Sequence, residues 1–248
     1  MMKDFLSKRL MEVAKFVPQG VCVADIGADH GKLLVYLAEQ KKITSGIAGE
    51  LNRGPWKNAS AFVHKTGHQS LIDVRQGNGL EVIDEKVDVI VIAGMGGALI
   101  ASILEDGQAK LKSTRRLILQ PNIGENRLRK WLEEHHWELV EEEIVQEDGI
   151  YYEILVAEPN VKGHSTYDQL PLSKERFYQI GPLLWKKKHP LLVPKLQLSL
   201  LRKLEVRNQL KRAKQESVKE KIAEIDAEIR DKEQVIKWLS MEKHSSDT

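Results

Sequence analysis

Residues 25 to 31 combine two carboxylates with two glycines in one short loop, Asp25-Ile26-Gly27-Ala28-Asp29-His30-Gly31. Glycine allows a tight turn and lets a ligand approach the backbone, as in nucleotide-binding loops. The loop lacks the third glycine of the G-x-G-x-x-G pattern, and Asp25 and Asp29 would be a poor lining for a pyrophosphate. Two carboxylates are better suited to a cationic ligand that carries an amino group and a sulfonium. A structural turn with capping aspartates is the alternative.

Two positions further along the chain could contact a nucleoside. Glu50 stands 19 residues after Gly31, at the end of an expected strand, where an acid can accept hydrogen bonds from ribose hydroxyls. Both NAD and S-adenosylmethionine carry such a ribose, so Glu50 alone does not separate these ligands. Gly77-Asn78-Gly79 follows the next expected strand, where the Asn78 side chain could read an adenine edge or simply close an Asn-Gly turn.

Two later motifs combine small and polar residues. Gly94-Met95-Gly96-Gly97 has three glycines in four residues, which leave a gap for a flat base and include no obvious acid or base. Gln120-Pro121-Asn122 ends another apolar run. Ligands of open α/β sheets bind at the carboxyl ends of the parallel strands. Because five expected strands end in polar or glycine-rich residues, we expect these motifs to meet at one edge of a sheet.

The elements that would position these motifs alternate along the chain. Residues 19–158 alternate β-type runs with helical patterns, which predicts a parallel sheet with crossover helices. The expected strands are 21–25, 44–48, 72–76, 87–92 and 117–120, and the expected helices are 32–40, 55–64, 97–104 and 125–135. Two further β-type runs, 138–145 and 150–157, flank Asp148-Gly149, a strong hairpin signal. A terminal antiparallel hairpin favours the methyltransferase fold, because an ordinary dinucleotide-binding domain would continue with another crossover helix.

The composition changes after Pro159, which predicts two domains, residues 1–159 and 160–248. The first contains 19 basic and 24 acidic side chains, and the second contains 19 basic and 12 acidic ones. A basic second domain indicates contact with a polyanion. Its apolar residues follow two helical stripes, Leu196, Leu200, Leu201, Leu204 and Leu210, then Val218, Ile222, Ile225, Ile229, Ile236 and Leu239. We expect an antiparallel coiled-coil hairpin within one chain, and a dimerising coiled coil is the alternative.

The composition also excludes several classes of protein. Hydrophobic residues make up 42% and charged residues 30% of the 248 positions, so the chain can bury a sizeable core. The single cysteine, Cys22, excludes a disulfide framework and a cysteine-based metal site. Residues 1–16 have an amphipathic helical pattern unlike a signal peptide, and no segment reaches the roughly 18 apolar residues of a membrane span. We therefore expect a cytoplasmic protein without membrane contact.

Taken together, these motifs resemble those of the bacterial tRNA adenine(22)-N1 methyltransferases. The matching segments run through the whole chain: Leu6-Ser7-Lys8-Arg9-Leu10, Asp25 to His30, Gly49-Glu50-Leu51-Asn52-Arg53-Gly54-Pro55, Gly94 to Gly97, Leu119 to Asn122, and Glu147-Asp148-Gly149 with Tyr152-Glu153. A lone glycine loop would not be specific, but Asp-His, Gly-Met-Gly-Gly and Gln-Pro-Asn together are. The resemblance implies a class I (Rossmann-like) methyltransferase sheet, S-adenosylmethionine as methyl donor and tRNA as acceptor.

The motifs and the resemblance together define a set of expected site residues. Closest to the chemistry we expect Asp29, Gly94, Met95 and Gly96. The expected cofactor contacts are Asp25, Gly27, Asp29, His30, Glu50, Asn78, Gly79 and Gly94. The expected tRNA contacts are Arg9, Gln120, Asn122, Lys186, Lys187, Lys188, Arg202, Arg207 and Arg212. We expect no metal ion and a monomeric protein.

The implied reaction is methyl transfer to N1 of an adenine at position 22. N1 of neutral adenine has an in-plane lone pair, so attack needs no prior removal of a proton and positioning can supply most of the acceleration. Asp29 could accept a hydrogen bond from adenine N6–H or hold the cofactor's amino group. The base would have to leave its stack in the folded tRNA. The alternatives are a methyltransferase for another RNA, a protein or a small molecule, and a non-catalytic RNA-binding adaptor.

Overall fold

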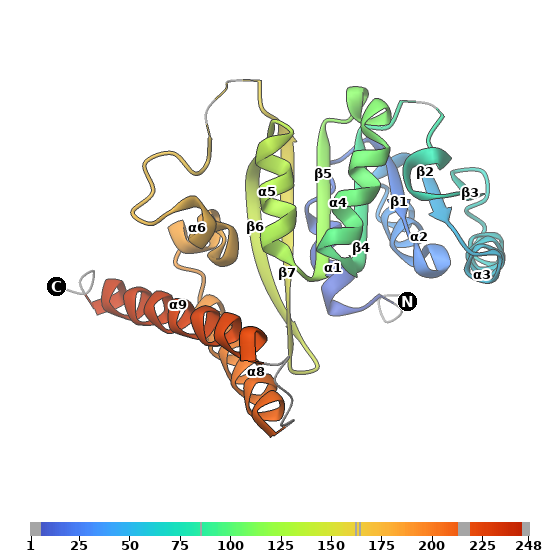
Figure 1. Ribbon diagram of the computed structural model, residues 1–248. Helices are drawn as coiled ribbons and strands as arrows, with labels where there is room; N and C mark the ends of the chain where they lie inside the picture. Colours follow the sequence, from blue (N-terminus) through green and yellow to red (C-terminus); the bar gives the residue numbers. More distant parts are fainter. Residues whose placement is uncertain (1–5, 85, 162, 164, 213–218, 245–248) are drawn as a thin grey trace. The chain divides into compact units, whose positions relative to one another are not determined.

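In a computed structural model, which describes residues 6–84, 86–161, 163, 165–212 and 219–244, seven strands form one sheet (Figure 1). The strand order is β3-β2-β1-β4-β5-β7-β6. The strands are β1 (Val21–Ile26), β2 (Ile43–Glu50), β3 (Ile72–Gln76), β4 (Val89–Gly96), β5 (Arg116–Ile123), β6 (Trp137–Glu147) and β7 (Ile150–Pro159). β1 to β5 are parallel, and β7 pairs antiparallel with both β5 and β6. The expected methyltransferase-type sheet with a terminal antiparallel hairpin is confirmed.

Helices cover both faces of this sheet. One face is covered by α1 (Lys8–Lys15), α2 (Lys32–Glu39) and α3 (Arg53–Lys65), whose apolar residues join Val89 and Val91 of β4 in one core cluster. On the other face, α4 (Gly97–Asp106) lies beside α5 (Glu125–Glu134) (Figure 1). The central strand β4 is apolar at consecutive positions because both of its faces are buried. The parallel strands β1 to β5 thus lie between two layers of helices, with their carboxyl ends along one edge.

β4 and β5 extend furthest beyond the ends that the sequence pattern indicates. β4 continues to Gly96 and β5 to Ile123, so that part of each motif expected after a strand lies within it. Met95 pairs with Pro121 and Gly96 with Ile123, with register shifts on both sides of Met95. Gly94 has a φ of +80°, which glycine adopts without the steric penalty of other residues. β4 and β5 therefore stay paired, with an irregular register, beyond the apolar runs from which their ends were predicted.

The N-terminal helix is shorter than the predicted span of residues 1–16. α1 begins at Lys8 because the Ser7 hydroxyl accepts a hydrogen bond from Leu10 N at 3.2 Å and caps the first turn. Residues 1–5 of the predicted span lie outside the described residues. At the other end of α1, Lys42 Nζ donates to the Ala14 carbonyl at 2.8 Å, where a cation is favoured by the helix dipole.

The chain divides into two compact units, Met1–Leu184 and Trp185–Thr248, whereas the composition changes at residue 159. The first unit extends further because α6 (Lys174–Ile180) and the start of α7 (Pro182–Lys186) pack on it. The fully buried Arg129 pairs with the buried carboxylates of Glu142, at 2.6 Å, and Glu153. Arg129 also donates to the Tyr178 carbonyl at 2.9 Å, and Glu142 accepts from Leu183 N at 2.8 Å. The buried charges of Arg129 and Glu142 and the backbone groups of the segment that connects β7 to the second unit therefore satisfy one another.

The second unit contains the expected helical hairpin. α8 (Leu192–Arg212) packs against α9 (Lys219–His244), and Lys203 pairs with Glu228 while Arg207 pairs with Asp226 at 3.3 Å. Later residues of one helix pair with earlier residues of the other, so the helices are antiparallel. The intramolecular hairpin is confirmed, although Val218 of the heptad stripe lies outside the described residues. No helix in the described part of the chain is long and apolar enough to cross a membrane.

Candidate active site

The loop after β1, residues 27–31, lies beside the glycine loop Gly94-Met95-Gly96-Gly97. Asp25, near the end of β1, is 4% exposed, and Gly27 continues the chain with a φ of +73°. Gly27 N donates to the Gly49 carbonyl at 2.8 Å, which ties the loop to the end of β2. A Cβ on Gly27 would lie 2.2 Å from Met95 Cε, so the Met95 side chain packs directly on this glycine. The two loops are neighbours at the carboxyl edge of the sheet.

The same edge brings Glu50 to the first loop. Glu50 is 8% exposed, and its Oε1 accepts a hydrogen bond from Asp29 N at 2.7 Å. Asp29 and His30 have φ values of 35° and 70°, in the left-handed region, and they form a 3-10 turn with Gly31 before α2. The Asp29 side chain is 81% exposed, with one carboxylate oxygen 3.5 Å from His30 Nε2. The turn therefore exposes the Asp29 carboxylate to solvent, while its backbone binds the buried carboxylate of Glu50.

The three carboxylates influence one another electrostatically. Burial, followed by the nearby charges of Glu50 and Asp29, raises the pKa of Asp25 to about 7. Burial also raises the pKa of Glu50, although the hydrogen bond from Asp29 N favours its charged form. Like charges in a poorly solvated site destabilise one another, and a cationic ligand would relieve that cost. The cluster is therefore chemically suited to a positively charged ligand.

Gly94 is held at both of its backbone polar groups by the Gln-Pro-Asn motif. Gly94 N donates to Gln120 Oε1 at 3.0 Å, and Asn122 Nδ2 donates to the Gly94 carbonyl at 2.8 Å. Gln120 is fully buried and also donates to the Pro121 carbonyl at 2.8 Å. Asn122 is exposed. The sequence predicts both side chains as tRNA contacts, but in this structure only Asn122 is accessible to a macromolecule.

The remaining glycines of the loop differ in the space around them. A Cβ on Gly97 would lie 2.3 Å from the Gly124 carbonyl oxygen, so the backbone before α5 packs directly on this glycine. A Cβ on Gly96 would meet no atom within 4 Å. Gly97 is thus required by the packing of the fold, whereas Gly96 borders open space beside the loop.

Asn78 and Gly79 lie next to Glu50 in the fold. Gly77 N donates to the Glu50 carbonyl at 3.0 Å, which places the third loop beside the second. The Asn78 side chain is engaged in a capping box with Glu81 at the start of the 3-10 helix Gly79–Val82. The sequence allows either a turn or an adenine contact for Asn78, and in the structure its side chain closes the turn. Asn78 is nevertheless exposed at the same edge of the sheet as Glu50.

Arg9 reaches the glycine loop from α1. Its guanidinium donates to Gln120 Oε1 and lies 5.4 Å from the ring centroid of Tyr152 on β7. Its NH1 would be 3.6 Å from a Cβ on Gly94. The local sequence pattern of β7 does not indicate that the Tyr152 ring faces the N-terminal helix, so only the structure reveals this contact.

The other expected tRNA contacts belong to the second unit, and Lys186 and its neighbours lie at its start. Five of them are exposed, namely Lys186, Lys187, Lys188, Arg202 and Arg212. Arg207 is partly buried and pairs with Asp226. Solvent-exposed cations of this kind can contact phosphates without a large desolvation cost.

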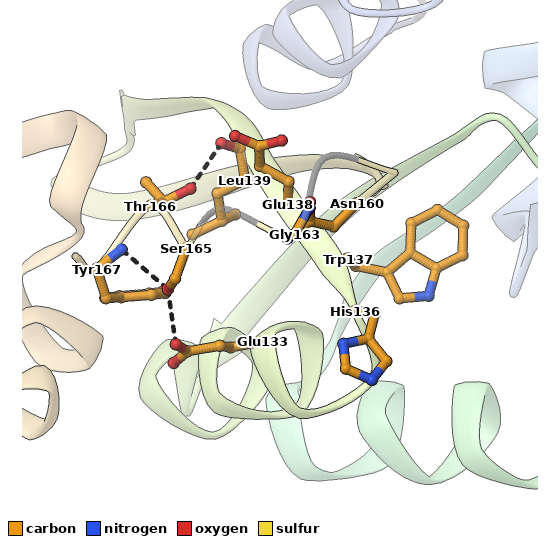
Figure 2. Close-up of a pocket in the computed structure, with 10 residues that line it drawn as sticks. All are labelled: Glu133, His136, Trp137, Glu138, Leu139, Asn160, Gly163, Ser165, Thr166 and Tyr167. Atoms are coloured by element: carbon orange, nitrogen blue, oxygen red, sulfur yellow. Dashed lines mark hydrogen bonds between the residues drawn. The ribbon is translucent and has the colours of Figure 1, made fainter.

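A cavity of about 280 Å³ lies at the opposite, amino edge of the parallel strands (Figure 2). It is lined by the end of α5, the start of β6 and the segment after β7, including Glu133, Ser165 and Tyr167. Ser165 Oγ donates to Glu133 Oε1 at 2.7 Å and accepts from Tyr167 N at 3.2 Å (Figure 2). These contacts fasten the segment after β7.

Among the described side chains, no group of three or more His, Cys, Asp or Glu could hold a metal ion.

The carboxylate cluster and the glycine loop lie in a segment that is similar to known proteins. A sequence model of the tRNA (adenine(22)-N(1))-methyltransferase family matches residues 23–234. The chain belongs to this family. The Bacillus subtilis tRNA (adenine(22)-N(1))-methyltransferase is 44% identical over 222 residues, which are 89% of this chain and 92% of that protein.

Solved structures of tRNA (adenine(22)-N(1))-methyltransferases and related proteins share the fold. The crystal structure of the B. subtilis m1A22 tRNA methyltransferase TrmK has a TM-score of 0.81 and 42% identity, covering 93% of this chain and 98% of that one. Streptococcus pneumoniae Sp1610, in complex with S-adenosyl-L-methionine, has a TM-score of 0.76 and 41% identity, covering 94% and 99%. The family indicated by the sequence motifs and its Rossmann-like class I sheet are both confirmed.

Proposed function

We propose that this chain transfers the methyl group of S-adenosylmethionine to N1 of adenine 22 in tRNA. The observation that supports this best is the pairing, within this family's fold, of a carboxylate cluster suited to a cation with a glycine loop that borders open space at Gly96. The test is to incubate the protein with tRNA and methyl-labelled cofactor and to analyse the nucleosides by mass spectrometry. Labelled N1-methyladenosine is expected, and a tRNA with guanine at position 22 should stay unlabelled. Label at N6 would contradict the proposal.

The residues at the edge of β1 and β2 fit this cofactor. S-adenosylmethionine supplies a methyl group on a positively charged sulfonium. Asp25 and Gly27 would lie near its methionine end, and the Glu50 carboxylate would accept hydrogen bonds from the ribose hydroxyls. Asp29 and His30 would cover it from the turn before α2. The adenine of the cofactor would be bordered by Asn78, Gly79 and Gly94.

The glycine loop would receive the adenine. Gly94, Met95 and Gly96 place no acid or base beside N1, and none is required because the lone pair of N1 is already available. Asp29, whose carboxylate is exposed, could accept a hydrogen bond from adenine N6–H and so orient the ring. Met95, which packs on Gly27, would help to exclude water from the reacting atoms. The chain's contribution is therefore mainly positioning.

Replacing the Glu50 carboxylate tests the cofactor assignment. Glu50→Gln keeps the volume and an oxygen that can accept from Asp29 N, but it removes the charge. A charge-assisted hydrogen bond contributes roughly 1.5–3 kcal/mol, so we expect the Kd for S-adenosylmethionine to rise about 10- to 150-fold by calorimetry. Asp73→Asn, an exposed carboxylate on β3, is the control and should bind normally. Undiminished affinity in Glu50→Gln would remove Glu50 from the site.

Salt dependence tests the role of the second unit. If Arg202 and Arg212 each neutralise one tRNA phosphate, then changing either to Gln should reduce the slope of log affinity against log salt by roughly 0.7–0.9. The affinity should be measured in the full chain by fluorescence anisotropy across a salt series. Lys65→Gln, which removes an exposed cation from α3, should leave the slope unchanged. Equal slopes in all variants would assign the basic hairpin another role.

The enzyme would act as a monomer in the cytoplasm. α8 packs against α9 within one chain, and Leu196, Ile229 and Leu239 of their apolar stripes are buried, which supports a monomer. A tRNA substrate supports a location in the cytoplasm. A methyltransferase for a small molecule or protein would need no salt-dependent tRNA binding, and a non-catalytic adaptor would bind tRNA but leave it unlabelled.

A further inference from the structure

The glycine loop depends on one buried amide side chain. Gln120 Oε1 accepts from Gly94 N at 3.0 Å and also from the Arg9 guanidinium, while its Nε2 donates to the Pro121 carbonyl at 2.8 Å and to Asn122 Oδ1 at 3.3 Å. With both ends of the amide engaged, Gln120 has a single orientation in which its oxygen points toward Gly94. The conformation of Gly94 is therefore coupled to the position of Arg9.

Arg9 is itself held from two sides. Its guanidinium lies over the ring of Tyr152 at 5.4 Å from the centroid, a distance at which a cation is attracted by the ring face. The first turn of α1 is fastened to the end of β6, because Glu147 Oε1 accepts from Lys8 N at 2.6 Å. Lys8 Nζ also donates to the Gln146 carbonyl at 3.0 Å. The β6–β7 hairpin thus supports both the helix and the side chain that reach Gln120.

We propose that Arg9 is a positioning residue that holds the glycine loop through Gln120, with Tyr152 and Glu147 as its supports, and that Arg9 is not a phosphate ligand of tRNA. This inference rests on the proposed methyl transfer, because the glycine loop is where the adenine would bind. Arg9 NH1 donates to the Gln120 amide oxygen and the guanidinium lies over the Tyr152 ring, so the protein itself already orients this side chain toward the glycine loop. Its role would be to keep the acceptor base aligned for in-line attack.

The two roles of Arg9 predict different kinetics. A positioning role predicts that Arg9→Met lowers kcat about 10- to 100-fold, the effect of a small misplacement of reacting groups, with the KM for tRNA and the salt slope nearly unchanged. A phosphate role predicts a higher KM, an unchanged kcat and a salt slope reduced by roughly 0.7–0.9. Arg202→Met in the second unit is the reference for a phosphate contact. The second pattern in Arg9→Met would overturn the proposal.

Tyr152 provides a matched pair of variants. Tyr152→Phe keeps the ring face and should keep kcat within about twofold, whereas Tyr152→Ala removes the ring and should lower kcat in the same direction as Arg9→Met. If Tyr152→Ala folds and has the kcat of the unchanged chain, Tyr152 is not a support of Arg9.

Amide hydrogen exchange at Gly94 tests the coupling without any reaction. The Gly94 N–H should be protected in the full chain and in Tyr152→Phe, and it should exchange at least tenfold faster in Arg9→Met and Tyr152→Ala, because the acceptor oxygen of Gln120 is no longer held. Unchanged protection in folded Arg9→Met and Tyr152→Ala would refute the positioning role. If exchange responds as expected but tRNA is not methylated by the unchanged chain, the support stands and the proposed function fails.

Discussion

Gly96→Val is expected to abolish methyl transfer while leaving the fold and the cofactor affinity intact. A Cβ at Gly96 meets no atom within 4 Å, and its φ of −72° is accessible to any residue, so we expect the chain itself to accommodate a valine side chain. The two added methyl groups would occupy the space that we assign to the adenine. Since a displacement of about 1 Å can cost roughly 100-fold in rate, we expect at least that loss in single-turnover transfer to tRNA.

Gly97→Ala is the contrasting variant, because it should destabilise the fold rather than block the space beside the loop. Its Cβ would lie 2.3 Å from the Gly124 carbonyl oxygen, and backbone atoms cannot move aside as a flexible side chain can. We expect a loss of about 1–3 kcal/mol in the free energy of unfolding, measured by urea denaturation. If Gly96→Val instead destabilises the protein and Gly97→Ala does not, the open space has been placed on the wrong side of the loop.

The second large effect concerns Asp25 and pH. Burial and the charges of Glu50 and Asp29 raise the pKa of Asp25 to about 7, so the carboxyl is mostly protonated at pH 6 and mostly ionised at pH 8. A cationic cofactor binds the ionised form better. We therefore expect its affinity to rise from pH 6 to pH 8, with proton release on binding below pH 7. Calorimetry in buffers of different ionisation enthalpy measures that release directly.

Asp25→Asn should remove this pH dependence and weaken binding at pH 8. Because the pKa of Asp25 is raised on folding, the folded state binds more protons than the unfolded state between about pH 4 and pH 7. Asp25 should thus lower the free energy of unfolding of the unchanged chain by roughly 3–5 kcal/mol over this range, and the fall should be smaller by about that amount in Asp25→Asn, in which the contribution of Glu50 remains. An Asp25→Asn variant with the same pH profile of cofactor affinity would assign the proton to another group.

Local sequence was sufficient for the architecture of the first unit. Apolar runs separated by helical patterns indicate parallel strands, and Asp148-Gly149 between two β-type runs indicates the final hairpin, because turn chemistry and periodicity act over a few residues. The same reasoning places the first loop, Glu50 and the glycine loop at one edge, since parallel strands share a direction. Motif order along the chain was enough to identify the family.

Other features arise only from contacts between residues far apart in sequence. The boundary at Leu184 depends on Arg129 and Glu142 meeting a connector more than 40 positions away, which composition cannot indicate. Gln120 ends an apolar run like a surface residue, yet it is fully buried because Gly94 and Arg9 satisfy its oxygen.

The raised pKa of Asp25 and the difference between Gly96 and Gly97 likewise depend on neighbours supplied by other strands. Residue type and spacing therefore determined the class of protein and the edge that carries the chemistry. Only the tertiary structure decided which of those residues are exposed at that edge and which are buried and hold the others in place, because burial and hydrogen-bond partners are properties of the packed chain.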